Sequence, residues 1–257
     1  MIEALAELSQ LSQAVLWQVF VVFVRIGAMV SLLPAFGEQS VPVRVKLGLA
    51  VAFTLIVWPA VPAMPAIAIP TQVAGLILAE ALTGLFMGLM LRLFVIALQI
   101  AGAIAAQSTS LSQLLGGAAT DPMPAMGHVL VIGGLALAAM MGLHVRFAEF
   151  MINSYQMVPA GHVIPPDMLG RAGIARVGHA FGLGFTLAAP FVIASLIYNV
   201  TLGVINKAMP QLMVAFVGAP AITAGGLILL ALAAPTMLSI WIEAMGRFLI
   251  DPFGGAG

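Results

Sequence analysis

The sequence predicts an all-α integral membrane protein, and its composition carries that prediction. The 257 residues include only nine Lys or Arg and nine Asp or Glu, while 62% are hydrophobic and the mean hydropathy is +1.16. A soluble domain has roughly a quarter charged residues. This chain therefore cannot cover its own surface with side chains that water solvates, and most of that surface must contact lipid or other protein.

About six long, partly kinked hydrophobic helical segments are expected. A bilayer core of about 30 Å needs roughly 20 helical residues, which the first segment matches, whereas the second is shorter and the last four are longer. Pro190, Pro220 and Pro235 lie inside the long segments and predict kinks or breaks. Broken backbone at membrane depth must be covered by protein or line a water-filled cavity. The segments are Leu11–Leu33, Val45–Val61, Val73–Ala106, Met126–Val158, Ile174–Ile205 and Leu212–Ile250.

Small and polar residues gather on one side of the third segment. With 100° per residue they fall within an arc of about 120°. Small residues let helix backbones approach closely, and polar ones bond to a neighbouring helix. The stripe therefore indicates packing inside the chain or, alternatively, contact with other subunits or an aqueous path. Its members are Glu80, Gly84, Gly88, Arg92, Gln99 and Gly102.

The fifth segment has a similar stripe. Ser195, Asn199 and Gly203 share one side and lead into a tight turn around Pro210. Gly178 and Gly182 have the GxxxG spacing of close helix pairs, a weak signal in a chain with 27 Gly.

Ionisable residues within apolar segments indicate either buried ion pairs or transport paths. Arg25, Glu80 and Arg92 are of this kind, and Arg146 and Glu149 are spaced i,i+3 and are expected to pair. The four His share no metal spacing, and there is no Cys, so we expect no metal or cofactor. The zero net charge does not favour nucleic-acid binding, and no catalytic motif occurs, so an enzyme is not expected.

The loop Gln107–Met126 is the most distinctive local feature. It is long for a connection without secondary structure, and such loops are often functional. Methionines adapt to changing shapes, so Met123 and Met126 beside Gly116 and Gly117 could form a deformable closure; an ordinary connector is the alternative. Its polar residues include Ser108, Thr109, Ser110 and Asp121.

Three stretches, in the same order, resemble the FliR family of export-gate subunits in flagellar type III secretion. They are LLPAFGEQSVPVRVKLGLAVAF (Leu32–Phe53), AEALTGLFMGLMLRLFVIALQIAGAIAAQ (Ala79–Gln107) and LAAPFVIASLIYNVTLGVINKAMPQLMVAFVGAPAITAGG (Leu187–Gly226), and the pair Asp121-Pro122 matches the family's loop. These matches cover more than a third of the chain.

The resemblance implies a non-enzymatic subunit of the bacterial inner membrane, located in the flagellar basal body. FliP- and FliQ-like subunits would be its partners, with FlhA- and FlhB-like proteins nearby and unfolded proteins as substrates. Residues 1–173 would be a FliP-like helical portion, and residues 174–257 a FliQ-like helical hairpin. The family likeness also implies that loop 107–126 is a pore plug.

Two alternatives remain open at this point. One is the homologous subunit of a virulence injectisome. The other is a self-sufficient small-solute transporter or channel that uses Arg25, Glu80 and Arg92 as a binding or proton path.

Overall fold

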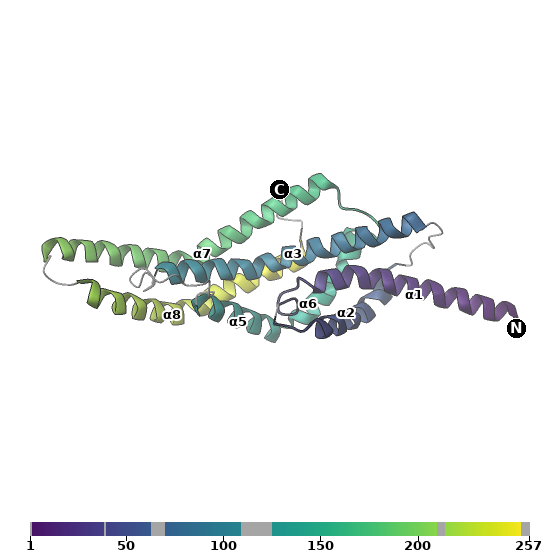
Figure 1. The fold of residues 1–257 in the computed structure, drawn as a ribbon, viewed down its shortest axis with the longest axis horizontal. Coiled ribbons are helices and arrows are strands. Elements are labelled where there is room, and N and C mark those ends of the chain that lie inside the picture. Colours follow the sequence, from purple (N-terminus) through teal and green to yellow (C-terminus); the bar gives the residue numbers. More distant parts are fainter. Residues whose placement is uncertain (1, 39, 63–69, 109–124, 210–213, 253–257) are drawn as a thin grey trace. The chain divides into compact units, whose positions relative to one another are not determined.

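The computed structural model describes residues 2–38, 40–62, 70–108, 125–209 and 214–252. These residues form helices and no strand, which confirms the expected all-α class. The elements, labelled in Figure 1, are α1 (Ile2–Val30), α2 (Val43–Val57), the 3-10 helix η1 (Trp58–Ala60), α3 (Pro70–Ser108), α5 (Ala125–Met140), α6 (Leu143–Met157), α7 (Pro166–Ala208) and α8 (Val214–Ile250).

Five of the described helices are long and apolar enough to cross a membrane, or up to six if α5 and α6 count as one interrupted span. The fourth predicted segment is interrupted at Met141 and Gly142, where α5 and α6 meet at a bend of 77°, and this agrees with the expected kinked or broken segments. Gly142 has a φ of 77°, a left-handed conformation that glycine adopts without steric cost.

The long helices pass through their internal prolines without interruption. Pro190 lies inside the 43-residue α7, and Pro235 lies inside α8. Pro220 also lies inside α8, so none of the three prolines breaks its helix, and the alternative expectation of a kink at these positions stays a prediction. A 43-residue helix is about 65 Å long, roughly twice the thickness of a bilayer core. A large part of α7 must therefore lie outside the hydrocarbon region or against other protein.

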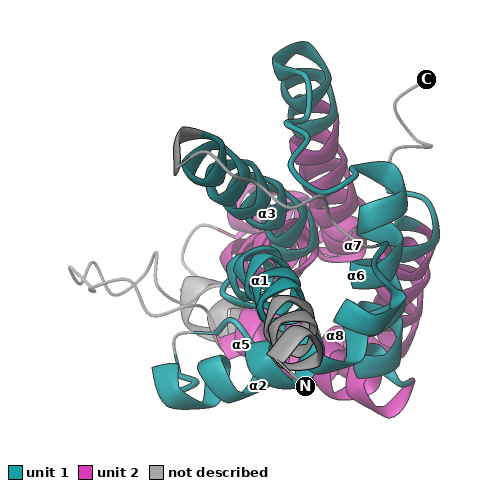
Figure 2. Ribbon diagram, turned by 90° about the vertical axis from the view of Figure 1, so that its right-hand side faces the viewer, with its two compact units in different colours: residues 1–92, 142–174, 248–257 teal, residues 93–141, 175–247 magenta. Residues whose placement is uncertain are grey.

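The chain divides into two compact units, coloured separately in Figure 2. The first contains residues 1–92, 142–174 and 248–257, and the second contains residues 93–141 and 175–247. Helices α3, α7 and α8 contribute residues to both units. The predicted division at residues 173 and 174 lies inside the uninterrupted α7, and it stays a prediction.

The first unit is built around α1. This helix packs against α2 and η1, and α2 also contacts α6. An aromatic cluster joins the loop after α1 to α2 and α6. The ring centroid of Phe36 in this loop lies 6.1 Å from that of Phe53 in α2 and 6.2 Å from that of Phe147 in α6. Lys46 Nζ donates to the carbonyl of Gly37 in the same loop at 2.9 Å.

The second unit has Trp241 of α8 at its centre. The indole is fully buried, and its Nε1 donates a 2.8 Å hydrogen bond to the carbonyl of Phe94 in α3. A buried indole N–H without an acceptor would be costly, so this bond determines which side of α8 faces α3. Close by, a Cβ at Gly134 would lie 2.7 Å from Leu98 Cδ1, so α5 approaches α3 through a residue without a side chain.

Candidate functional site

A buried ion pair between α1 and α3 is the principal polar feature of the first unit. Arg25 Nε lies 2.7 Å from Glu80 Oε2, and Arg25 Nη2 lies 2.9 Å from Oε1. Both side chains have zero exposure. Two parallel bonds from a planar guanidinium to a carboxylate are among the strongest side-chain contacts in proteins. The partners are 55 positions apart in the sequence, so this is a tertiary contact.

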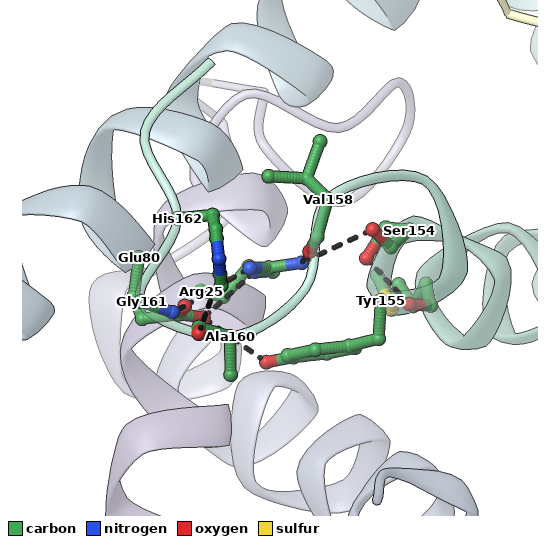
Figure 3. Close-up of polar contacts among 9 residues, drawn as sticks. Arg25, Glu80, Ser154, Tyr155, Val158, Ala160, Gly161 and His162 are labelled. Carbon is green, nitrogen blue, oxygen red and sulfur yellow. Dashed lines mark hydrogen bonds and ion pairs between the residues drawn. The ribbon is translucent and has the colours of Figure 1, made fainter.

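The third guanidinium nitrogen of Arg25 binds the C-terminal end of α6. Its Nη1 donates to the carbonyl of Ser154 at 3.2 Å and to that of Val158 at 2.8 Å. The carbonyl of Ser154 also accepts the backbone N–H of Val158, whereas the carbonyl of Val158 lies just past the end of the helix. Carbonyls at the end of a helix carry partial negative charge, so a cation there is favourable. Figure 3 shows the guanidinium between the Glu80 carboxylate and these carbonyls.

Glu80 also holds the connection between α6 and α7. Its Oε1 accepts a 2.8 Å bond from the backbone N–H of Gly161, and the Tyr155 hydroxyl lies 3.4 Å from Oε2. The Tyr155 ring lies under the guanidinium, with Arg25 Cζ 3.9 Å from its centroid, which is a cation–π contact. The centre formed by Arg25, Glu80, Tyr155 and Gly161 therefore joins α1, α3, α6 and the connection to α7 (Figure 3).

Gly161 suits this centre for two reasons. Its φ of 77° turns the chain so that its N–H reaches Glu80. A Cβ at this position would also lie 2.8 Å from Leu76 Cδ1. Gly161 and Tyr155 were not among the site residues predicted from the sequence. A buried Arg does demand a carboxylate and further acceptors, but sequence alone does not show which residues supply them.

The predicted stripe on α3 begins with residues that face α1 of the same chain. A Cβ at Gly84 would lie 2.9 Å from Ala28 Cβ and closer still to the carbonyl of Arg25. A Cβ at Gly88 would lie 2.8 Å from the carbonyl of Met29. The two glycines therefore allow the close approach of α3 to α1 that brings Glu80 to Arg25. Their described contacts are with α1 of the same chain.

The other members of that stripe have different surroundings. Arg92 lies 4.0 Å from Glu38, and both side chains are about one-quarter exposed. Gln99 is half-buried. Gly102 belongs to the second unit, where a Cβ would lie 2.7 Å from the backbone N of Gly127 in α5.

The stripe on α7 lies at the surface of the chain. Asn199 Nδ2 donates to Ser195 Oγ at 3.1 Å, and this pair is exposed. A Cβ at Gly203, Gly178 or Gly182 would meet no atom within 4 Å. These small residues therefore serve no packing contact within the described chain.

Most of the predicted plug loop lies outside the described residues. This applies to Thr109, Ser110, Gly116, Gly117, Asp121 and Met123. Gln107 and Ser108 are the last residues of α3, and Met126 is 8% exposed in the first turn of α5. The loop is therefore shorter than expected, and Met126 belongs to a packed helix end.

Two further sequence expectations concern charged and metal-binding residues. The ion pair expected between Arg146 and Glu149 is wrong, because no ion pair in the described part of the chain joins them and both are exposed. The described residues also contain no group of three or more His, Asp or Glu that could hold a metal ion.

Comparisons with known proteins cover nearly the whole chain. The family model of bacterial export proteins, family 1, matches residues 16–248. The flagellar biosynthetic protein FliR of Caulobacter vibrioides is 34% identical over 248 residues, which cover 93% of this chain and 98% of that protein. FliR of Escherichia coli is 27% identical over 214 residues, or 82% of each chain, and FliR of Aquifex aeolicus is 30% identical over 221 residues, or 83% of each. The similarity includes both units.

Proposed function

Because the chain belongs to the bacterial export proteins, family 1, and is a subunit of the flagellar protein-export apparatus, we propose that it builds the export channel together with FliP- and FliQ-like subunits. Unfolded flagellar proteins would pass through this channel across the bacterial inner membrane at the flagellar basal body. The role is structural and non-enzymatic, and FlhA- and FlhB-like proteins of the same apparatus would deliver substrates and energy.

The observation that carries the proposal is the incomplete packing of α7 and α8. Within an apolar window of 18 residues in each helix, 28% of the residues are buried in α7 and 17% in α8, against 67% in α3. None of the residues 192–209 is buried. Lipid alone would suit the apolar side chains, but it offers no further partner to the exposed Asn199 and the half-buried Ser195, which in the described part of the chain bond only to each other through Asn199 Nδ2 and Ser195 Oγ. Small and hydroxyl- or amide-bearing residues are typical of helix–helix contacts in membranes.

The length of α7 favours the same interpretation. A helix of about 65 Å extends far beyond a bilayer core of about 30 Å. A ring of such helices from several subunits would cover the apolar surface that extends past the lipid. The Arg25–Glu80 pair gives no support to a small-solute transporter, because both side chains have zero exposure and hydrogen-bonded partners.

Loop 107–126 is proposed as the plug that closes this channel at rest. Its composition is nearly uncharged, and it connects the ends of α3 and α5. A substrate would displace it during export. The flagellar names of the relatives favour a flagellar over an injectisome assembly.

Purification from a strain that expresses the neighbouring export genes tests the assembly. The chain should be recovered in one stable particle with FliP- and FliQ-like proteins, and a stable particle of this chain alone would refute the proposal.

Leu in place of both Gly178 and Gly182 should prevent assembly while the chain still accumulates, because a Cβ at these glycines meets nothing inside the chain. Gly48→Leu, at another glycine with open surroundings, is the matched control and should assemble normally.

A further inference from the structure

Helix α6 carries a polar stripe of four residues. Arg146, Glu149, Asn153 and Gln156 are spaced by three, four and three residues, so they share an arc of about 80°. All four are exposed. The opposite face of α6 is buried in the first unit through Leu143, Phe147, Phe150, Met151, Ser154 and Tyr155.

The orientation of this polar stripe is determined by the buried centre. Arg25 binds the carbonyls of Ser154 and Val158 at the end of α6, and the Tyr155 ring lies against the guanidinium. A rotation of α6 that buried the stripe would break these contacts. The polar face is therefore held outward by the same contacts that hold the helix in place.

Lipid is a poor neighbour for the polar stripe. No ion pair in the described part of the chain neutralises Arg146 or Glu149. An Arg or an acidic residue at the centre of a membrane helix is costly unless it is paired. Helix α6, with 15 residues, is also only about 22 Å long. By contrast, α5 exposes Ile132 (65%) and Val129 (56%), which lipid or an apolar partner would accept.

The composition of the stripe also disfavours two other neighbours. The core of a subunit interface is depleted of charged residues, and burying these two charges there would require matching partners. A surface for anionic lipid headgroups would carry several Lys or Arg. Here one positive charge, one negative charge and two amides give no net charge.

We propose that the polar stripe of α6 borders the water-filled export path and contacts the unfolded polypeptide in transit. This inference rests on the proposed function. Amide side chains both donate and accept hydrogen bonds, so Asn153 and Gln156 can bond transiently to the backbone of any sequence. Arg146 and Glu149 balance each other, so the stripe neither retains nor repels chains according to their charge.

The absence of Cys from the chain allows a direct test with single cysteines. Asn153→Cys and Gln156→Cys would be introduced into the assembled export complex, with Ile132→Cys as the control on an exposed apolar surface. The substrate would be an export protein fused to a folded domain that stops its passage, with a cysteine in its unfolded segment. The readouts are labelling by a charged maleimide and disulfide cross-linking to the stopped substrate.

We expect the two stripe cysteines to be labelled, to lose labelling several-fold when the substrate is present, and to cross-link to the substrate. We expect the control Ile132→Cys to show no substrate-dependent change in labelling and no cross-link. Equal labelling with and without substrate, without cross-links, would show that the stripe faces bulk water and would overturn the inference. No labelling in an intact complex would show that a partner or lipid covers the stripe and would also overturn it. Either result leaves co-purification with FliP- and FliQ-like subunits unchanged, so failure of the inference is distinguishable from failure of the proposed function.

Discussion

Glu80→Gln is the sharpest perturbation of the buried centre, because it removes one charge and almost no volume. Glu80 uses both carboxylate oxygens as acceptors. Oε1 accepts from Arg25 Nη2 and from the Gly161 N–H, and Oε2 accepts from Arg25 Nε. A glutamine offers one oxygen and one NH₂ group, so in either orientation a donor faces a donor. Arg25 is then left as a buried cation without a counter-charge.

The expected loss of stability follows from the burial of the pair. Removing one partner of a buried ion pair costs about 3–5 kcal/mol, since the other charge stays uncompensated. Both side chains have zero exposure here, so water cannot relieve the penalty. For a chain of this length each kcal/mol corresponds to about 2–4 °C in the thermal midpoint. We therefore expect Glu80→Gln to lower the midpoint by roughly 6 to 20 °C.

The assay is thermal unfolding of the purified complex in mild detergent, together with the steady-state abundance of the chain in cells. Arg171→Met is the matched control, because Arg171 pairs with Asp167 at the surface with side chains 80% and 68% exposed. Such exposed pairs contribute little. Arg171→Met should unfold at the midpoint of the unmodified chain. If Glu80→Gln also unfolds at that midpoint, the buried centre does not stabilise the fold and the reasoning fails.

A double variant separates charge from packing. Replacing both Arg25 and Glu80 by Met removes the uncompensated charge, and buried pairs exchanged for apolar residues are often neutral in stability. Here the buried carbonyl of Val158 would still lose its Arg25 partner, which costs about 1–3 kcal/mol for a buried group. The N–H of Gly161 would also lose its Glu80 partner, but Gly161 is exposed, so water can replace that bond. The double variant should therefore be more stable than Glu80→Gln and less stable than the unmodified chain.

Two further predictions concern helix packing and the loop. Gly88→Leu should sharply reduce the yield of folded chain and of complex, because even a Cβ would lie 2.8 Å from the Met29 carbonyl and 3.1 Å from Leu32 Cβ; purification of an intact complex at normal yield would contradict this packing. Deletion of Ser110–Ala119 should raise the resting permeability of the membrane to ions and small solutes, measured in cells that contain the complete gate, and unchanged permeability would rule out the plug.

The sequence by itself determined the class of protein and the extent of most helices. Nine basic and nine acidic residues among 257 exclude a water-covered surface, whatever the tertiary arrangement. Apolar segments long enough to span a bilayer predicted α1, α3, α7 and α8 to within a few residues at most ends. Hydropathy is a sum over neighbouring residues, so it is readable without knowledge of the fold.

The tertiary structure alone decided how the charged residues are used. Arg25 and Glu80, two isolated ionisable residues in sequence, form a fully buried pair across 55 positions. Arg146 and Glu149, which helix spacing suggested as partners, instead share an exposed stripe with Asn153 and Gln156. Spacing on one helix defines which residues share a face. Whether that face meets lipid, water or another helix depends on contacts such as that of Arg25 with the end of α6, which form only when distant segments come together.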